Sequence, residues 1–187
     1  MVKEPVPGRV KTRLGRDVGM VSAAHWFRKQ ALSTIRRLDD PRWELVLAVS
    51  PDREGLTSRF WPQHLKRIPQ GRGDLGARMG RLFRASPAPK TCIIGADIPA
   101  IQPDHIKAAF VALGSHSGIL GPSEDGGYWL VGLRHGKRSP AGLFMGVRWS
   151  TQFALQDTQK SANSINWAHI ETLNDVDTLD DLKRQKA

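Results

Sequence analysis

The sequence predicts an α/β protein in which helices cover both faces of a mostly parallel, mixed sheet. Short runs of β-branched and aliphatic residues alternate with amphipathic helical patterns, and this alternation is typical of parallel sheets. The chain of 187 residues is long enough to bury a sizeable core, and no internal repeat or shift in composition marks a second domain. We therefore expect residues 1–187 to form a single domain.

The elements are predicted from their patterns in chain order. A helix is expected over residues 20–38, where apolar side chains recur on one face, and a strand over 43–49, which ends at turn-forming residues 50–52. The remaining helices are predicted over residues 74–84, 103–113, 151–160 and 178–186, and the remaining strands over 91–95, 117–120, 128–133 and 169–173.

The composition is that of an ordinary soluble protein, with 40% hydrophobic and 25% charged residues. No apolar run approaches the roughly 20 residues that span a bilayer, and no apolar segment follows Lys3 as in a secretory signal. These features predict a cytoplasmic protein with no membrane partner. The one cysteine, Cys92, excludes an internal disulfide, and its apolar neighbours predict a buried strand residue rather than a nucleophile.

The formal net charge of +10 points to an anionic partner, either nucleic acid or a small polyanion. A nucleic-acid binder would interleave cations with aromatic residues on one element, whereas here the cations are scattered along the chain. The six histidines are also dispersed and show no zinc-site spacing with cysteine. The charge therefore favours a small polyanionic substrate first and nucleic acid second.

A basic loop over residues 3–14 is the most informative segment. Its prolines and Gly8 hold the chain out of regular structure, and glycine permits close approach of the backbone to a ligand. The loop can therefore present cations and free N–H groups to a di- or triphosphate. The alternative is a solvated basic loop beside a helix. Its four cations are Lys3, Arg9, Lys11 and Arg13.

Carboxylates follow several predicted strands, at the sheet edge where open α/β proteins bind ligands. Asp97 comes directly after a buried strand, where it is suited to hold Mg²⁺ or Mn²⁺, although it could instead cap a turn. Asp175 and Asp177 lie between a strand and a helix; capping explains Asp177 but not Asp175.

Two glycine-rich segments are less specific. Glu124 and Asp125 precede a glycine pair and an aromatic-led strand, which fits a substrate pocket but also an ordinary hairpin turn. Residues 70–78 form a glycine-rich entry to a helix that could lie against a base or a sugar.

Taken together, these segments resemble the DUF2064 family, the cofC-like glycosyltransferases of the GT-A superfamily. The motifs occur in the family's order over almost the whole chain: Lys-x-Pro-x-Pro-Gly-x-x-Lys-Thr-Arg-Leu at 3–14, Gly73-Asp74-Leu75-Gly76, Gly95-Ala96-Asp97-Ile98-Pro99, Gly121-Pro122-Ser123-Glu124-Asp125-Gly126-Gly127-Tyr128, Trp149-Ser150-Thr151 and Asp175-Val176-Asp177-Thr178. The resemblance implies a nucleotide-diphospho-sugar transferase fold, a three-layer α/β/α sandwich. It also implies kinship with phospholactate and molybdopterin-cofactor guanylyltransferases, and some members are associated with arsenosugar biosynthesis.

The resemblance also implies roles for individual residues. Lys11, Arg13 and Asp97 would be catalytic, and Asp97, Asp177 and Asp175 would bind Mg²⁺ or Mn²⁺. The nucleotide would contact Lys3, Pro7, Gly8, Lys11, Arg13, Gly73 and Asp74. The acceptor would contact Glu124, Asp125, Gly126, Gly127, Tyr128 and Trp149. Family members have a complete strand before the basic loop, whereas only Met1 and Val2 precede Lys3 here, so we expect a truncated first strand.

The sequence thus predicts a metal-dependent transferase that uses a nucleotide-activated sugar donor and a small-molecule acceptor. One alternative is a guanylyltransferase-like enzyme acting on a phosphorylated small molecule. An alternative of another class is a non-catalytic or nucleic-acid-binding protein with the same fold.

Overall fold

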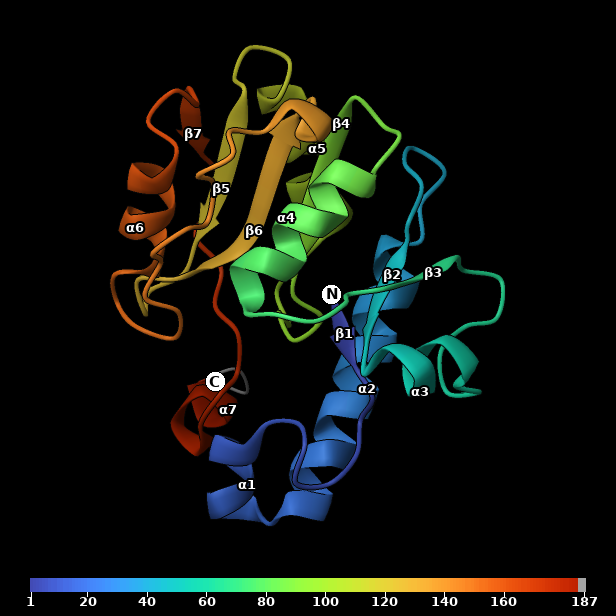
Figure 1. Ribbon diagram of the computed structural model, residues 1–187. Coiled ribbons are helices and arrows are strands. Elements are labelled where there is room, and N and C mark those ends of the chain that lie inside the picture. The colour runs from blue at the N-terminus through green and yellow to red at the C-terminus, as the bar shows by residue number, and fades with distance from the viewer. Residues whose placement is uncertain (185–187) are drawn as a thin grey trace. The chain divides into compact units, whose positions relative to one another are not determined.

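The computed structural model describes residues 1–184, in which helices and strands alternate (Figure 1). The chain divides into two compact units that are interleaved in sequence. The first unit contains residues 1–69, 95–101 and the chain from residue 174 onward, and the second contains residues 70–94 and 102–173. Each unit has its own sheet. Among the described helices, none combines the length and apolarity needed to cross a membrane.

The first unit is built on a parallel sheet in the order β1-β2-β3, in which Val2 of β1 pairs with Val49 of β2. Its strands are β1 (Val2–Lys3), β2 (Leu47–Ser50) and β3 (Arg67–Pro69). Its helices are α1 (Thr12–Val18), α2 (Met20–Leu38), α3 (Asp52–Thr57) and α7 (Leu179–Arg184). The first strand is two residues long, as the sequence led us to expect.

The core of the first unit forms where α2 turns its apolar face inward. Phe27 and Ile35 on this face are buried in one cluster with Val49 of β2 and with Trp61. Burying side chains of this size stabilises the fold by about 1.5–3 kcal/mol each, so the core holds α2 in a fixed position within the first unit. The Trp61 indole donates a hydrogen bond to Glu4, which fixes the start of the basic loop to this core.

The second unit contains a mixed sheet in the order β4-β6-β5-β7. In it β6 runs antiparallel to β4 and β5, while β5 and β7 are parallel. Figure 1 shows α4 and α5 on opposite faces of this sheet. The strands are β4 (Lys90–Ile94), β5 (Gly118–Pro122), β6 (Tyr128–Arg134) and β7 (Trp167–His169). The helices are α4 (Leu75–Ala85), α5 (Pro103–Ala112), the 3-10 turn η1 (Gly136–Arg138) and α6 (Ala154–Ser161).

The predicted α/β class is confirmed. The strands form two sheets, one parallel and one mixed, where the sequence predicts one mostly parallel, mixed sheet, and the other differences concern short elements. The sequence does not reveal α1, α3 and β3, because each has only three to seven residues, and in α1 and α3 most side chains are exposed. The last predicted strand, 169–173, lies instead at Trp167–His169. The last predicted helix, 178–186, is observed as Leu179–Arg184, and its remaining residues lie outside the described part of the chain.

Cys92 lies on β4, as predicted. Burial raises the pKa of its thiol to about 12, with a smaller opposing effect from Lys90. A thiol with so high a pKa is almost wholly protonated at neutral pH and is therefore a poor nucleophile.

Candidate metal centre

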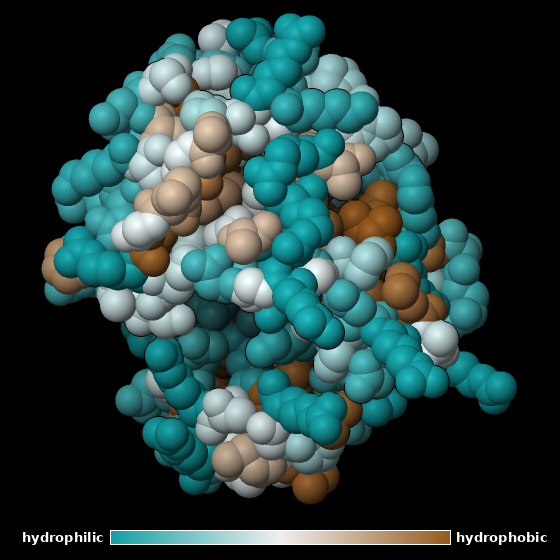
Figure 2. Space-filling model, viewed as in Figure 1, coloured by the Kyte–Doolittle hydropathy of each residue, from teal (hydrophilic) through white to brown (hydrophobic). Residues whose placement is uncertain are grey.

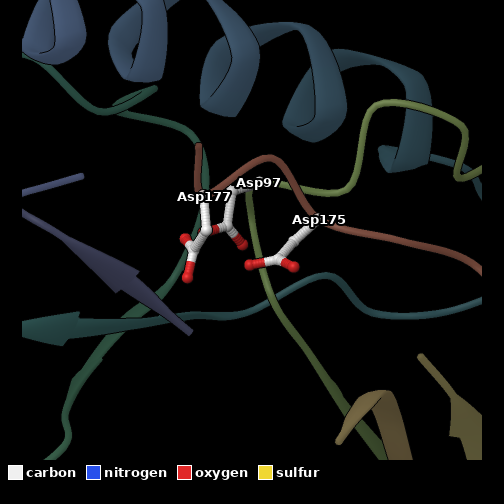
Figure 3. A group of neighbouring side chains, drawn as sticks. All are labelled: Asp97, Asp175 and Asp177. Carbon is white, nitrogen blue, oxygen red and sulfur yellow. The ribbon is translucent and has the colours of Figure 1, made fainter. Parts of the chain in front are cut away.

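Three carboxylates converge within the first unit, those of Asp97, Asp175 and Asp177 (Figure 3). One oxygen from each lies within 4.8 Å of the others. Asp97 follows β4 in the chain, and the other two precede α7. The structure therefore brings together the three metal-ligand candidates of the sequence: Asp97, Asp177 and its close rival Asp175.

The segment that carries Asp97 is held from both sides. Ala96 and Ile98 are buried, so the side chain between them points out of the core. From α2, the Arg37 guanidinium donates hydrogen bonds of 2.7 Å to the carbonyl oxygens of Pro99 and Ile101. Asp97 is thus placed by core packing and by one buttressing arginine.

Alternation of side chains places the other two carboxylates. Val176 is buried, so its neighbours Asp175 and Asp177 both project to the opposite side, towards Lys11. The start of α7 then fixes the backbone, because Asp181 Oδ2 accepts hydrogen bonds from the N–H groups of Asp177 and Thr178. Thr178 caps α7 in turn, because its Oγ1 accepts a hydrogen bond from the Asp181 N–H at 3.2 Å, so the cap is Thr178 rather than Asp177.

The Lys11 ammonium lies among the three carboxylates. Its Nζ is 2.6 Å from Asp97 Oδ2, 2.6 Å from Asp177 Oδ1 and 3.4 Å from Asp175 Oδ2. Its side chain is only 5% exposed. The Lys11 backbone has a left-handed conformation with φ of 45°, an unfavourable one for a residue with a Cβ, of the kind that is concentrated at functional sites.

The electrostatics of the centre follow from this arrangement. Burial opposes the charge on Lys11, but the three carboxylates outweigh it, so the net effect is a raised pKa and a charged ammonium at neutral pH. Burial also raises the pKa of Asp175 to about 6, opposed by Lys11 and reinforced by the neighbouring carboxylates. Arg13 lies at the rim, 61% exposed and 3.4 Å from Asp177 Oδ2. Three carboxylates thus face two cations.

The donor set fits a hard divalent cation. Mg²⁺ and Mn²⁺ prefer oxygen ligands, and Mg²⁺ typically uses one or two carboxylates together with water and substrate phosphate. All three donors here are carboxylates, and they are 25–39% exposed, which leaves oxygens accessible from solvent. The cluster can therefore serve a metal that also contacts a dissolved substrate.

The rest of the basic loop differs from Lys11. Lys3, Arg9 and Arg13 are exposed, and the tip at Pro7 and Gly8 is exposed as well, with Gly8 at φ of 76°. The side chains of these residues are therefore accessible to a ligand in solvent. Their role in phosphate binding, and that of Lys3 in particular, remains a prediction.

The second unit holds the other predicted site residues. Asp74 is the N-cap of α4, where its side chain accepts a hydrogen bond from the N–H of Ala77, and Gly73 has φ of 103°. Residues 123–127 form the hairpin between β5 and β6. A side chain at Gly126, which has φ of 80°, would overlap the backbone of Gln152. Helix capping thus accounts for the presence of Asp74, and turn geometry accounts for Gly126. Their roles in ligand binding remain predictions.

Two of the predicted acceptor residues do lie together. The rings of Tyr128 and Trp149 pack edge to face with centroids 6.4 Å apart, and Phe144 packs against Trp149 at 6.2 Å. A Cβ on Gly76 would clash with both Phe144 and Trp149, so the second glycine of the Gly-Asp-Leu-Gly motif allows this contact. The sequence reading missed Phe144, and its left-handed backbone leaves no recognisable sequence signal.

Arg37, which the sequence does not distinguish from the other scattered cations, holds the backbone next to Asp97. We expect Arg37→Met to weaken Mn²⁺ binding about 10-fold, within the range for loss of a partner that orients a metal ligand. Arg36→Met, which removes the same charge from the exposed neighbouring position, should leave Mn²⁺ affinity unchanged in the same calorimetric titration. Equal affinities of both variants would contradict the positioning role.

Comparison with known proteins identifies a family and several similar folds. The model of the bacterial family DUF2064, "Uncharacterized protein conserved in bacteria", matches residues 34–151. The structure is similar to that of a "putative nucleotide-diphospho-sugar transferase" from Desulfovibrio desulfuricans G20, with a TM-score of 0.83 and 28% identity over 98% of this chain and 83% of that one. The predicted fold is thereby confirmed.

More distant structures share the fold alone. Rv0371c from Mycobacterium tuberculosis H37Rv has a TM-score of 0.52 at 15% identity, over 84% of this chain and 81% of that one. Its homologue from Mycobacterium sp. strain JC1 has a TM-score of 0.51 at 12% identity, over 85% of this chain and 80% of that one. The comparison with curated proteins gives no match.

Proposed function

We propose, from the premise that this chain belongs to the DUF2064 family, that it is a metal-dependent glycosyltransferase-type enzyme that uses a nucleotide-activated sugar. The observation that carries the proposal is the carboxylate cluster with two cations of the basic loop beside it. The proposal is supported by the similarity to the D. desulfuricans protein over almost the whole chain.

In this proposal each residue of the cluster has a stated task. Asp97, Asp175 and Asp177 would hold Mg²⁺ or Mn²⁺, which supplies positive charge to the diphosphate of the donor. Lys11 and Arg13 would pair with phosphate oxygens and stabilise the charge that develops as the sugar departs. Cations placed where charge develops contribute strongly to catalysis when water is largely excluded, and Lys11 is the more buried of the two.

The proposal is tested by thermal shift with a panel of nucleotides and nucleotide sugars, with Mn²⁺ or with EDTA. A ligand at ~100 times its Kd stabilises the folded state by about 2.7 kcal/mol. For a chain of this size that corresponds to a rise in Tm of roughly 5–10 °C. We expect such a rise for one class of base and only with Mn²⁺. A panel without any metal-dependent shift would refute the proposed function.

A nucleotidyltransferase would use the same cluster, because the exposed cations of the basic loop could also meet a triphosphate. The two activities differ in their products. Glycosyl transfer from a nucleotide sugar releases a nucleotide, whereas nucleotidyl transfer from a triphosphate releases pyrophosphate. Assay of the released product with the ligand found by thermal shift therefore decides between them.

A nucleic-acid binder predicts a different pattern. Its affinity would fall steeply with salt, by a slope of about −0.9 per neutralised phosphate in a log–log plot, and would need no metal. Figure 2 shows hydrophilic residues over most of the visible face, with apolar residues in small patches. The three carboxylates of the cluster carry negative charge and would repel a phosphate backbone. We expect only weak, salt-sensitive binding of DNA or RNA; tight binding in EDTA at physiological salt, without nucleotide binding, would favour the alternative.

A further inference from the structure

The Lys11 ammonium has as many N–H donors as the cluster has carboxylates. An ammonium has three N–H donors and no acceptor, and three carboxylates surround it at 2.6, 2.6 and 3.4 Å. The same three carboxylates each offer an oxygen within 4.8 Å of the other two and could hold a metal ion. A cation coordinated by all three oxygens would need the space that Nζ occupies. The two cations cannot be bound there together.

The ammonium can leave without a change of the fold. The Lys11 backbone is fixed, because its carbonyl accepts the hydrogen bond from the Gly15 N–H at 2.8 Å and both Val10 and Leu14 are buried. The four-carbon stem is flexible, so the charged end can move while the backbone stays in place. Two residues before and after Lys11, the side chains of Arg9 and Arg13 are exposed, so the Lys11 ammonium has solvent near it into which it can move.

We propose that Lys11 and a divalent cation are alternative occupants of the carboxylate cluster, so that metal binding releases the Lys11 ammonium for the phosphates of the donor. This inference rests on the proposed function. In the absence of metal the Lys11 ammonium neutralises part of the negative charge of the cluster and reduces the repulsion that would push the carboxylates apart. When the metal takes its place, the freed ammonium becomes available to the donor, and the two ligands favour each other's binding.

The first test uses Mn²⁺ alone, without nucleotide, and compares the wild type with Lys11→Met and Arg9→Met by calorimetry. Both variants lose one positive charge from the same loop, but only the first loses the competitor within the cluster, since Arg9 is exposed. We expect Lys11→Met to bind Mn²⁺ more tightly by about 5- to 150-fold, the usual size of a coupling between two ligands. Arg9→Met should stay close to the wild type. An unchanged affinity of Lys11→Met, or an equal gain in both variants, would overturn the exchange.

A second measurement needs no variant, and so it holds even if Lys11→Met folds poorly. The rate at which an acylating reagent modifies Lys11 is followed by mass spectrometry, with Lys66, whose side chain is 61% exposed, as internal reference. We expect slow modification of Lys11 that speeds up when excess Mn²⁺ is added, while Lys66 is unaffected. A Lys11 rate that does not respond to Mn²⁺ would overturn the proposal.

These results are distinguishable from those that test the proposed function. Metal-dependent binding of a nucleotide sugar, together with equal Mn²⁺ affinities of the wild type and Lys11→Met, would leave the function standing and remove the exchange. Nucleotide-sugar binding that is equally strong in EDTA, with no Mn²⁺ binding by any of the three proteins, would remove both the exchange and the metal dependence of the proposed function.

Discussion

Asp97→Asn is expected to abolish metal-dependent nucleotide binding while leaving the fold intact. The substitution keeps the size of the side chain but removes the charge that a divalent cation needs, and Asp97 Oδ2 lies 2.6 Å from the Lys11 Nζ that occupies the cluster, as close as Asp177. We expect Mn²⁺ affinity to fall by at least about 100-fold. Loss of a residue that only orients a metal ligand lowers metal affinity by up to about 100-fold, and loss of the ligand itself should lower it at least as much. Calorimetry with nucleotide in the presence of Mn²⁺ measures the effect.

The matched control for this substitution is Asp180→Asn. Asp180 also belongs to the first unit, but its side chain is 82% exposed and lies outside the cluster. It should retain full nucleotide affinity. If Asp97→Asn bound nucleotide as well as the wild type with Mn²⁺ present, Asp97 would not be a metal ligand. Unchanged circular dichroism is needed to attribute a loss to the site rather than to unfolding.

Lys11→Ala and Arg13→Ala should each weaken nucleotide binding far more than Lys183→Ala. Each of the first two residues contacts the cluster, whereas Lys183 is 69% exposed and is paired with Asp180 at 3.7 Å. A hydrogen bond to a charged group contributes about 1.5–3 kcal/mol, which corresponds to a roughly 10- to 150-fold loss of affinity. Calorimetric titration of the three variants with the same nucleotide and Mn²⁺ would measure the difference. Comparable losses in all three would mean that a diffuse positive field, and no specific contact, attracts the nucleotide.

The carboxylates could be found from the sequence because each stands beside a strong pattern. Asp97 follows a run of apolar strand residues, and the alternation of Asp175, Val176 and Asp177 separates polar from buried positions. The position of a carboxylate after a strand is a local property, so it can be read without knowing which segments meet in space.

The partner of these carboxylates could not be predicted in the same way. Sequence alone marks Lys11 as one of four cations in a loop, and gives no sign that it alone is buried, since that depends on contacts with residues up to 166 positions away. The role of Arg37 is hidden for the same reason, because its partners are backbone carbonyls, which carry no side-chain signal.

The interleaving of the first unit has a consequence for synthesis on the ribosome. Lys11 and Asp177 are 166 positions apart, so at about 5–20 residues per second the ribosome needs roughly 8–33 s to add the last carboxylate. By then every residue of the second unit has been made, since that unit ends at Leu173. A nascent chain that stops before Asp175 thus contains the whole second unit and only one of the three carboxylates, so the cluster is completed only after the second unit has been synthesised.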